Sequence, residues 1–267
     1  MESDLYGRKV VAVTRAYDAQ LKPLGDLALG QLDAQSRERI IDIGCGAGQT
    51  CLQLADSVGG AGFVLGVDRS PMLVDYATTR TYGLPQIEMV EADASTYAFE
   101  PRRYDALFSR FGVMAFPDPV AAFLNFWRAL KPDGRLAFVC WRHFDENELD
   151  YLPFNAAATH LPPEHVDTVR AAYPFSFAEA DNIKSILSAA GFDSITCNAH
   201  DMPVCAGNFD ETLELCLTAG ALGQRVRVNP ALRAQVIDPV REALAKKDSS
   251  DGLYMNAAVW VVTAKAG

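Results

Sequence analysis

Residues 40–50 read IIDIGCGAGQT, a branched apolar run followed directly by three glycines in five positions. The apolar half is typical of a buried strand, and a strand interior would not tolerate the glycines that follow. A strand therefore turns abruptly into a helix here. Glycines at such a turn allow positive φ angles and close approach of a ligand, and the following helix presents unpaired N–H groups. The stretch predicts a cradle for a small polar molecule, with a tight turn that binds nothing as the alternative.

Buried apolar runs alternate with helical patterns on both sides of this turn. The alternation predicts a doubly wound α/β fold, in which a parallel sheet with right-handed crossovers carries helices on both faces. The last apolar run is too hydrophobic for an exposed edge and should insert into the sheet. The expected strands are residues 39–43, 62–67, 86–91, 104–109, 135–141, 193–199 and 255–264.

The chain divides into an N-terminal helical flap, residues 1–36, and a larger domain, residues 37–267. In the flap, apolar residues recur at helical spacing and are interrupted by Pro23, which predicts two short amphipathic helices. The domain loses its strand-and-helix alternation at about 142–178 and 201–252, and these segments are expected to be helical cap insertions.

Two start signals predict helices in the second insertion. Asn208 with Glu211 three residues on is a capping box, and Asn229-Pro230 opens another helix.

Charge and composition favour a small-molecule partner. The net charge of −10 argues against nucleic acid and anionic membranes, which are recognised first through basic surface. No apolar run approaches the length of a membrane span. Six scattered cysteines without a Cys-x-x-Cys pair suggest a reduced cytoplasm. We expect a cytoplasmic monomer or homodimer.

Acidic residues stand where the first three strands end. Asp42, Asp68 and Asp93 would meet at one edge of a parallel sheet, where such folds bind ligands. Acids do not suit a pyrophosphate, but they suit hydroxyls, an amine or a cation. The spacing Gly44-x-Gly46-x-Gly48 also lacks the Gly-x-Gly-x-x-Gly pattern of dinucleotide sites.

At this point the sequence resembles the class I S-adenosylmethionine-dependent methyltransferases, and the resemblance covers about residues 40–191. It is carried by four motifs in order: Asp42-Ile43-Gly44-Cys45-Gly46-Ala47-Gly48, Gly66-Val67-Asp68-Arg69-Ser70, Glu91-Ala92-Asp93-Ala94 and Leu130-Lys131-Pro132-Asp133-Gly134-Arg135-Leu136. It implies a seven-stranded Rossmann-like sheet in the order 3-2-1-4-5-7-6, with strand 7 antiparallel.

The resemblance also implies which residues hold the cofactor, S-adenosylmethionine. Asp68 would bind the ribose hydroxyls, Asp93 and the Ala94 backbone would meet the adenine, and Gly44–Gly46 would pass under the methionine part. Met72 would pack on the adenine, and Ser109 would face the methyl group. The full predicted set is Asp42, Gly44, Cys45, Gly46, Asp68, Arg69, Met72, Asp93, Ala94 and Ser109.

Catalytic residues are harder to predict, because methyl transfer from a sulfonium needs mainly alignment and exclusion of water. If a base or anchoring group is used, the candidates are His143, just past the fifth strand, and Arg110, at the end of the fourth. Arg110 could equally form a surface ion pair, and a lone histidine is more often structural. His160, His165 and His200 are weaker candidates.

The acceptor is expected to be a small, partly aromatic metabolite, methylated on oxygen or carbon in preference to nitrogen or sulfur by direct in-line displacement. The strand-four end, Ser109-Arg110-Phe111-Gly112, differs from the motif of enzymes that methylate base amines and offers no aspartate for a metal. With residues 138–142, this region resembles the bacterial small-molecule group that includes quinone-biosynthesis methyltransferases. Aromatic residues of the insertions should line the pocket or form the core of the cap: Phe144, Tyr151, Phe154, Tyr173, Phe175 and Phe209.

Two other readings stay open. A protein could keep the cofactor pocket without transferring a methyl group, as a non-methylating enzyme or a binding regulator. A nicotinamide-dependent oxidoreductase shares the sheet and the acid of strand two, although the glycine spacing and Asp93-Ala94 disfavour it.

Overall fold

A computed structural model describes residues 11–162, 168–169 and 175–267. Its centre is a seven-stranded sheet in the order β3-β2-β1-β4-β5-β7-β6, in which β7 is antiparallel to both of its neighbours. The predicted fold class, strand order and orientation are therefore confirmed. The strands are β1 (Arg39–Ile43), β2 (Phe63–Asp68), β3 (Ile87–Glu91), β4 (Tyr104–Arg110), β5 (Leu130–Trp141), β6 (Phe192–Val204) and β7 (Met255–Ala266).

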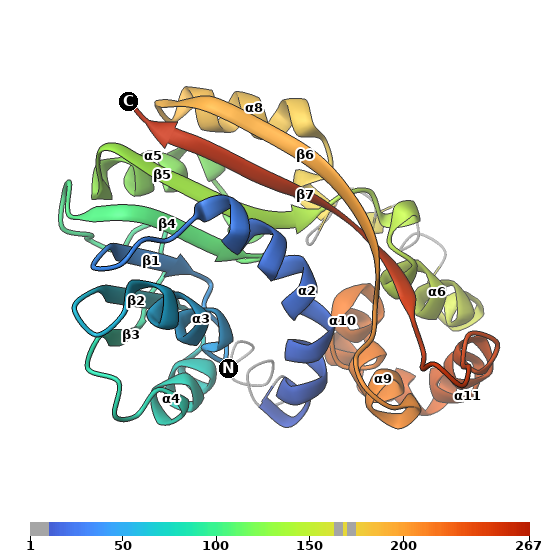
Figure 1. Cartoon of the computed structure of the whole chain (residues 1–267). Helices are drawn as coiled ribbons and strands as arrows, with labels where there is room; N and C mark the ends of the chain where they lie inside the picture. The colour runs from blue at the N-terminus through green and yellow to red at the C-terminus, as the bar shows by residue number, and fades with distance from the viewer. Residues whose placement is uncertain (1–10, 163–167, 170–174) are drawn as a thin grey trace.

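Helices cover both faces of the sheet (Figure 1). On one face, α2 (Thr14–Leu32) lies along β4, β5 and β7, while α3 (Gln49–Val58) and α4 (Pro71–Arg80) pack on β1, β2 and β3. On the other face, α5 (Pro119–Ala129) packs on β5 and on α8 (Ala180–Ala189), which covers β6. The core between these layers explains why the inner strands β1, β2, β4 and β7 are mostly apolar and buried, whereas the edge strands β3 and β6 carry exposed polar residues.

Helix α2 continues unbroken across Pro23, so the predicted break is wrong. A proline inside a helix removes one hydrogen bond and crowds the preceding turn, at a cost of about 3 kcal/mol. Burial offsets this cost, because Leu24, Ala28 and Leu32 are each at most 1% exposed. The packed face of the helix overrides the local signal.

Four helices form a cap beyond the carboxyl ends of β4 and β5 (Figure 1). They are α6 (Glu148–Ala156), α9 (Phe209–Cys216), α10 (Gly220–Val228) and α11 (Leu232–Ala245), and they contact one another. The capping box of Asn208 and Glu211 at the start of α9 is confirmed. The second insertion holds three helices where two were predicted. The start of α10 was missed because its first turn is capped by a side chain from α6, which is distant in the sequence.

Short 3₁₀ turns complete the described secondary structure: Val113–Ala115, Phe144–Glu146, Ala158–His160 and Phe175–Phe177. Within the described ranges, no helix has the length and hydropathy needed to span a membrane.

Candidate functional site

The glycine turn leaves β1 with three positive φ angles, at Gly44 (68°), Gly46 (53°) and Gly48 (81°). Gly48 is the residue before α3, as the strand-turn-helix prediction requires. A Cβ on Gly44 would lie 2.6 Å from the Cα of Gly112, so the loops after β1 and β4 touch through their backbones. A Cβ on Gly46 would meet nothing within 4 Å, so space is open beside that residue.

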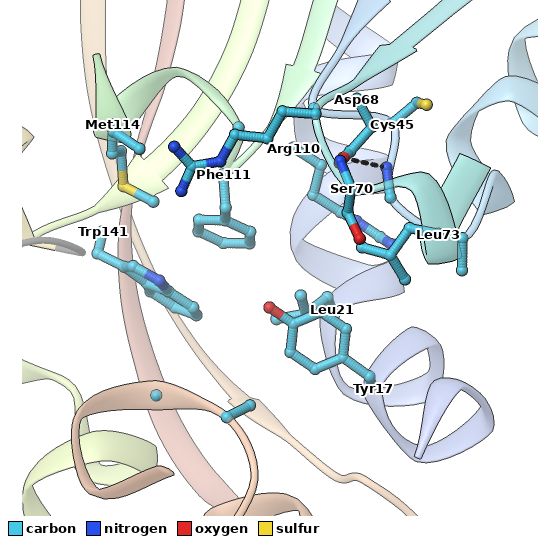
Figure 2. A pocket seen from close by; sticks show the side chains of 18 of the residues that line it. Tyr17, Leu21, Cys45, Asp68, Ser70, Leu73, Arg110, Phe111, Met114 and Trp141 are labelled. Carbon is cyan, nitrogen blue, oxygen red and sulfur yellow. Dashed lines mark hydrogen bonds between the residues drawn. The ribbon is translucent and has the colours of Figure 1, made fainter. Parts of the chain in front are cut away.

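A cavity of about 740 Å³ extends from this turn to the cap. Figure 2 shows its wall, with Asp68 and Cys45 near the turn and Phe111 and Trp141 farther along. Eight of the predicted site residues line it: Gly44, Cys45, Gly46, Asp68, Arg69, Asp93, Ala94 and Arg110. One cavity therefore joins the ends of β1, β2, β3 and β4.

The Asp68 carboxylate holds the glycine turn by accepting hydrogen bonds from backbone N–H groups. Its Oδ2 accepts a hydrogen bond from the Gly46 N–H at 2.9 Å, and its Oδ1 accepts one from the Ser70 N–H at 2.9 Å. Burial raises the pKa of Asp68, and these two hydrogen bonds oppose the rise. The Ser70 hydroxyl makes no cap for α4 and is a buried oxygen without a hydrogen-bond partner among the described residues, which leaves it for a ligand.

Asp42 lies beneath the turn and does not line the cavity. The predicted role of Asp42 in binding the cofactor would require a residue on the cavity wall. Asp42 is fully buried, and its Oδ2 accepts hydrogen bonds from the Thr50 hydroxyl and from the Cys51 thiol. Burial raises its pKa to about 6. Asp42 thus ties β1 to the first turn of α3 and supports the glycine turn from below.

Ser109 and Met72 also lie off the cavity wall. The Ser109 hydroxyl donates to the Ile43 carbonyl at 2.7 Å and accepts from the Gly112 N–H at 3.1 Å, so it joins the two loops. Met72 is at the start of α4, and the neighbouring Leu73 lines the cavity in its place.

Arg110 lines the cavity with a guanidinium that has protein partners. It donates to the Gln49 side chain and, at 3.2 Å, to Asp18 of α2. Asp18 also accepts from Arg80 at 2.6 Å, and Arg80 donates to the Ala47 carbonyl at 3.2 Å. This Asp18 cluster fastens α2 to the glycine turn. The described contacts of Arg110 are therefore those of a structural link.

The described histidines lie outside the cavity wall. His143 Nε2 is 3.1 Å from the Glu179 carboxylate, and both side chains are at least half exposed. His160 and His200 do not line the cavity either. His165 lies outside the described residues.

The described aromatic residues of the cavity wall come from α2, from the segment after β4 and from the end of β5, and not from the cap: Tyr17, Phe111, Phe116 and Trp141. Phe111 and Trp141 stack with their ring centroids 4.0 Å apart, and Tyr17 of α2 directs its hydroxyl toward them (Figure 2). Phe111 has a φ of 61°, a strained conformation for an aromatic residue. Both residues stand in the motifs quoted from the sequence, yet nothing local showed that they would stack.

Of the two alternatives left open for the aromatic residues of the insertions, the structure shows the second for Phe144 and Phe154, which form the core of the cap. Phe144 and Phe154 pack edge to face, 5.5 Å apart, and Phe154 is fully buried. Tyr151 and Phe209 do not line the cavity. Tyr173 and the side chain of Phe175 lie outside the described part of the chain.

A carboxylate that the sequence did not single out, Asp150, lines the cap side of the cavity. It is 3% exposed, and its Oδ1 accepts a hydrogen bond from the Ala221 N–H at 2.8 Å. Its pKa is raised to about 6 by burial, and the Ala221 hydrogen bond opposes the rise. The acid is therefore poised to hold or release a proton near neutral pH.

For metals, the described ranges show no group of three or more His, Cys, Asp or Glu side chains arranged to hold an ion. The polar groups at the turn instead fit an organic ligand with hydroxyls, since Ser70 and Asp68 face the cavity beside open space.

Comparison with known proteins agrees with this geometry. Residues 40–134 match the family model described as a methyltransferase domain, so the resemblance found in the motifs is confirmed over that segment. The aklanonic acid methyltransferase of Streptomyces sp. is 32% identical over 118 residues, which are 43% of this chain and 54% of the relative. A 2-phytyl-1,4-naphtoquinone methyltransferase of Nostoc punctiforme is 32% identical over 117 residues, 43% of this chain and 51% of the relative.

Among solved structures, a phosphoethanolamine N-methyltransferase 2 of Haemonchus contortus, in complex with phosphomonomethylethanolamine and S-adenosylhomocysteine, superposes with a TM-score of 0.62. It is 20% identical and the match covers the whole of this chain and 60% of that chain, so it supports the fold. The sequence matches span about half the length of the curated relatives named above. The family-model match at residues 40–134 includes the glycine turn and the ends of β1 to β4 and stops before the helices of the cap.

Proposed function

We propose that this chain, which carries a methyltransferase domain over residues 40–134, transfers a methyl group from S-adenosylmethionine to a small, partly aromatic acceptor. One observation carries the proposal. A single cavity has the glycine turn and Asp68 at one end and a stacked aromatic pair farther along its wall, inside a methyltransferase fold. The acceptor atom is oxygen or carbon in preference to nitrogen or sulfur.

The residues of the turn fit this cofactor. Asp68 is placed to accept hydrogen bonds from ribose hydroxyls, and Ser70 has an unused buried hydroxyl beside it. Asp93 and Ala94 would meet the adenine, and the open space at Gly46 leaves room for the methionine part. Bound there, the cofactor supplies an activated methyl group, and the protein has to align the acceptor and exclude water.

The far end of the cavity favours a flat acceptor. Phe111 and Trp141 present an aromatic wall, and a ring can stack on it or meet its edge. The relatives named after aklanonic acid and a naphthoquinone support an acceptor of this kind. The smaller set of polar groups around the wall would orient it.

Calorimetry with S-adenosylhomocysteine tests the cofactor site. The wild-type protein should bind S-adenosylhomocysteine and should not bind NAD. Asp68→Ala should weaken the affinity by about 10- to 100-fold, because the ribose hydroxyls lose a charged partner. Asp75→Ala, an exposed acid on α4, is the matched control and should leave the affinity unchanged. Tight NAD binding, or an unchanged affinity in Asp68→Ala, would contradict the assignment.

A panel of naphthols, naphthoquinols and 1-naphthylamine, incubated with S-adenosylmethionine and followed by mass spectrometry, tests the transfer. Methylated naphthol or quinol is the expected product. Cofactor binding without any methylated product would favour a protein that kept the pocket and lost methyl transfer. The cytoplasmic location and the choice of monomer or homodimer stay predictions.

A further inference from the structure

We infer that Asp150 is the base of this site: its carboxylate receives the hydroxyl of a phenolic acceptor at the cap end of the cavity and takes its proton. The inference rests on the proposed function, because it needs a methyl donor at the glycine turn. It goes beyond that function by assigning the acceptor a hydroxyl on an aromatic ring and by naming the group that recognises it.

Hydrogen bonds between the start of α6 and strand β7 fix the position of Asp150. Asn147, which precedes α6, is fully buried, accepts from the Ala258 N–H of β7 at 2.8 Å and donates to the His143 carbonyl at 3.0 Å. Glu148 accepts from the Asn256 N–H of β7 at 3.1 Å. The first turn of α6 is thereby attached to the central sheet, as the positioning of a reacting group requires.

One oxygen of Asp150 already has a structural partner. Oδ1 accepts from the Ala221 N–H at the start of α10, and a Cβ on Gly220 would lie 2.2 Å from that oxygen. Gly220, with a φ of 67°, is therefore the residue that lets the helix end approach. The hydrogen bond of Asp150 to the described residues goes to Oδ1, and the residue lines the cavity, so Oδ2 is left for a ligand.

The cavity wall beside Asp150 is partly apolar. Leu149, Pro153 and Leu222 line it. Two titratable groups of the packed helices line the cavity with Asp150: Cys216 of α9, and Arg227 of α10, which donates to the Thr218 carbonyl. Lys247, after α11, pairs with Glu148. Burial raises the pKa of the Cys216 thiol to about 12, with the Asp150 charge as the second cause, so this thiol stays protonated.

The other lining carboxylates are less suited to this role. Asp18 is paired with Arg80 and Arg110, and Asp68 holds two backbone N–H groups at the cofactor end. Asp93 is exposed and accepts from Ser95. Asp150 alone among these four lies on a helix of the cap, α6.

The chemical step balances with these groups. The acceptor O–H bond breaks and its proton goes to Asp150 Oδ2. The electron pair left on the acceptor oxygen forms the new C–O bond to the methyl carbon, and the pair of the broken C–S bond stays with the donor sulfur, which becomes a neutral thioether. No metal or oxidant is needed for this balance.

The variant Asp150→Asn tests the inference, because the amide keeps an oxygen for the Ala221 N–H and presents a donor where the base was. The probes are 1-naphthol and 1-methoxynaphthalene, which lacks the hydroxyl proton, titrated by calorimetry in the presence of S-adenosylhomocysteine. At pH 8 the wild-type protein should prefer 1-naphthol by about tenfold or more, since its hydroxyl meets a charged acceptor. Asp150→Asn should reduce the preference to within about twofold.

Asp238→Asn, an exposed acid on α11 of the same cap, is the control and should keep the preference. Unchanged S-adenosylhomocysteine affinity in Asp150→Asn shows that the cofactor end is intact. A wild-type protein that binds the cofactor product but does not distinguish the two probes, or a variant that keeps the preference, overturns the inference and leaves the proposed function standing. If the wild-type protein does not bind S-adenosylhomocysteine, the proposed function and the role of Asp150 are both rejected.

Discussion

The two ends of the cavity each present a carboxylate, the half-buried Asp68 at the glycine turn and the buried Asp150 at the cap, but the two are held differently. Asp68 accepts two N–H groups from loops that flank its own strand and the neighbouring strand. Asp150 accepts one N–H from a helix 71 residues away in the chain and keeps its second oxygen. A ligand at the turn therefore meets a site completed by short loops, whereas a ligand at the cap meets a site completed by packing between helices.

The largest loss of stability should come from adding a methyl group at the glycine turn, which is the end of the cavity built from short loops. Gly44→Ala should lower the free energy of unfolding by about 2–5 kcal/mol, because the residue has a positive φ and its Cβ would clash with the Gly112 backbone. Gly46→Ala, with open space, should lower it by about 1 kcal/mol and weaken S-adenosylhomocysteine binding instead. Urea unfolding and calorimetry separate the two effects. Equal destabilisation would show that the approach to Gly112 is not tight.

The pH dependence of stability should report the buried acid of the cap. A folded-state pKa of about 6, against an ordinary value of 3.8, means that the folded protein holds a proton that the unfolded chain releases. This group therefore stabilises the fold most below pH 4, and that contribution is lost as the pH rises to about 6. The difference in unfolding free energy between the wild-type protein and Asp150→Asn should change by about 2–3 kcal/mol between pH 4 and pH 8.

Asp42→Asn sharpens this comparison, because Asp42 has a pKa raised to about the same value but lies off the cavity wall. Both variants should flatten the pH dependence measured by chemical denaturation. Only Asp150→Asn should alter the preference for 1-naphthol. A change of that preference in Asp42→Asn would show that the two ends of the cavity are coupled through the turn.

Removal of the Asp18 cluster should have a smaller effect. Asp18→Asn leaves Arg80 and Arg110 without their shared carboxylate, and the free energy of unfolding should fall by about 1–3 kcal/mol. Asp26→Asn on the same helix breaks an exposed pair with Lys22 and should change it by less than about 1 kcal/mol. Thermal unfolding of both variants checks the expectation, and equal effects would remove the cluster as a fastening of α2.

The smallest effect is expected from His143, which pairs with Glu179 at the surface. His143→Ala should keep turnover of the best naphthol acceptor within about twofold of wild type. In the same assay Asp150→Asn should lose about 100-fold or more, as expected for loss of a general base. A large loss in His143→Ala would instead place the proton acceptor outside the cavity described above.

The sheet was predictable because its signals are local. The run at Ile40–Ile43, the three glycines and the acids at strand ends each follow from a few adjacent residues, and they suffice for strand order once the family is recognised. The break at Pro23 was wrong because the buried face of α2 outweighs one lost hydrogen bond. The helix propensity of neighbouring residues does not include the stability that a helix gains by packing on the rest of the fold.

The cap side of the site could not be predicted in the same way. The start of α10 depends on the Asp150 carboxylate, and the aromatic wall depends on Phe111 and Trp141 meeting across neighbouring strands. Neither contact leaves a pattern in adjacent residues. Ser109 shows that a recognised motif does not fix the role of each of its residues. It was expected to face the methyl group, and its hydroxyl instead joins two loops.

The contact between Asn147 and the Ala258 N–H has a consequence for cooperativity. β7 lies inside the sheet and its Asn256 and Ala258 amides are held by the first turn of the cap. Opening of the cap therefore exposes amides of a central strand, so cap and sheet should unfold as one unit. Hydrogen exchange at Ala258 should be as slow as in the middle of the sheet, and the cap should have no separate unfolding transition.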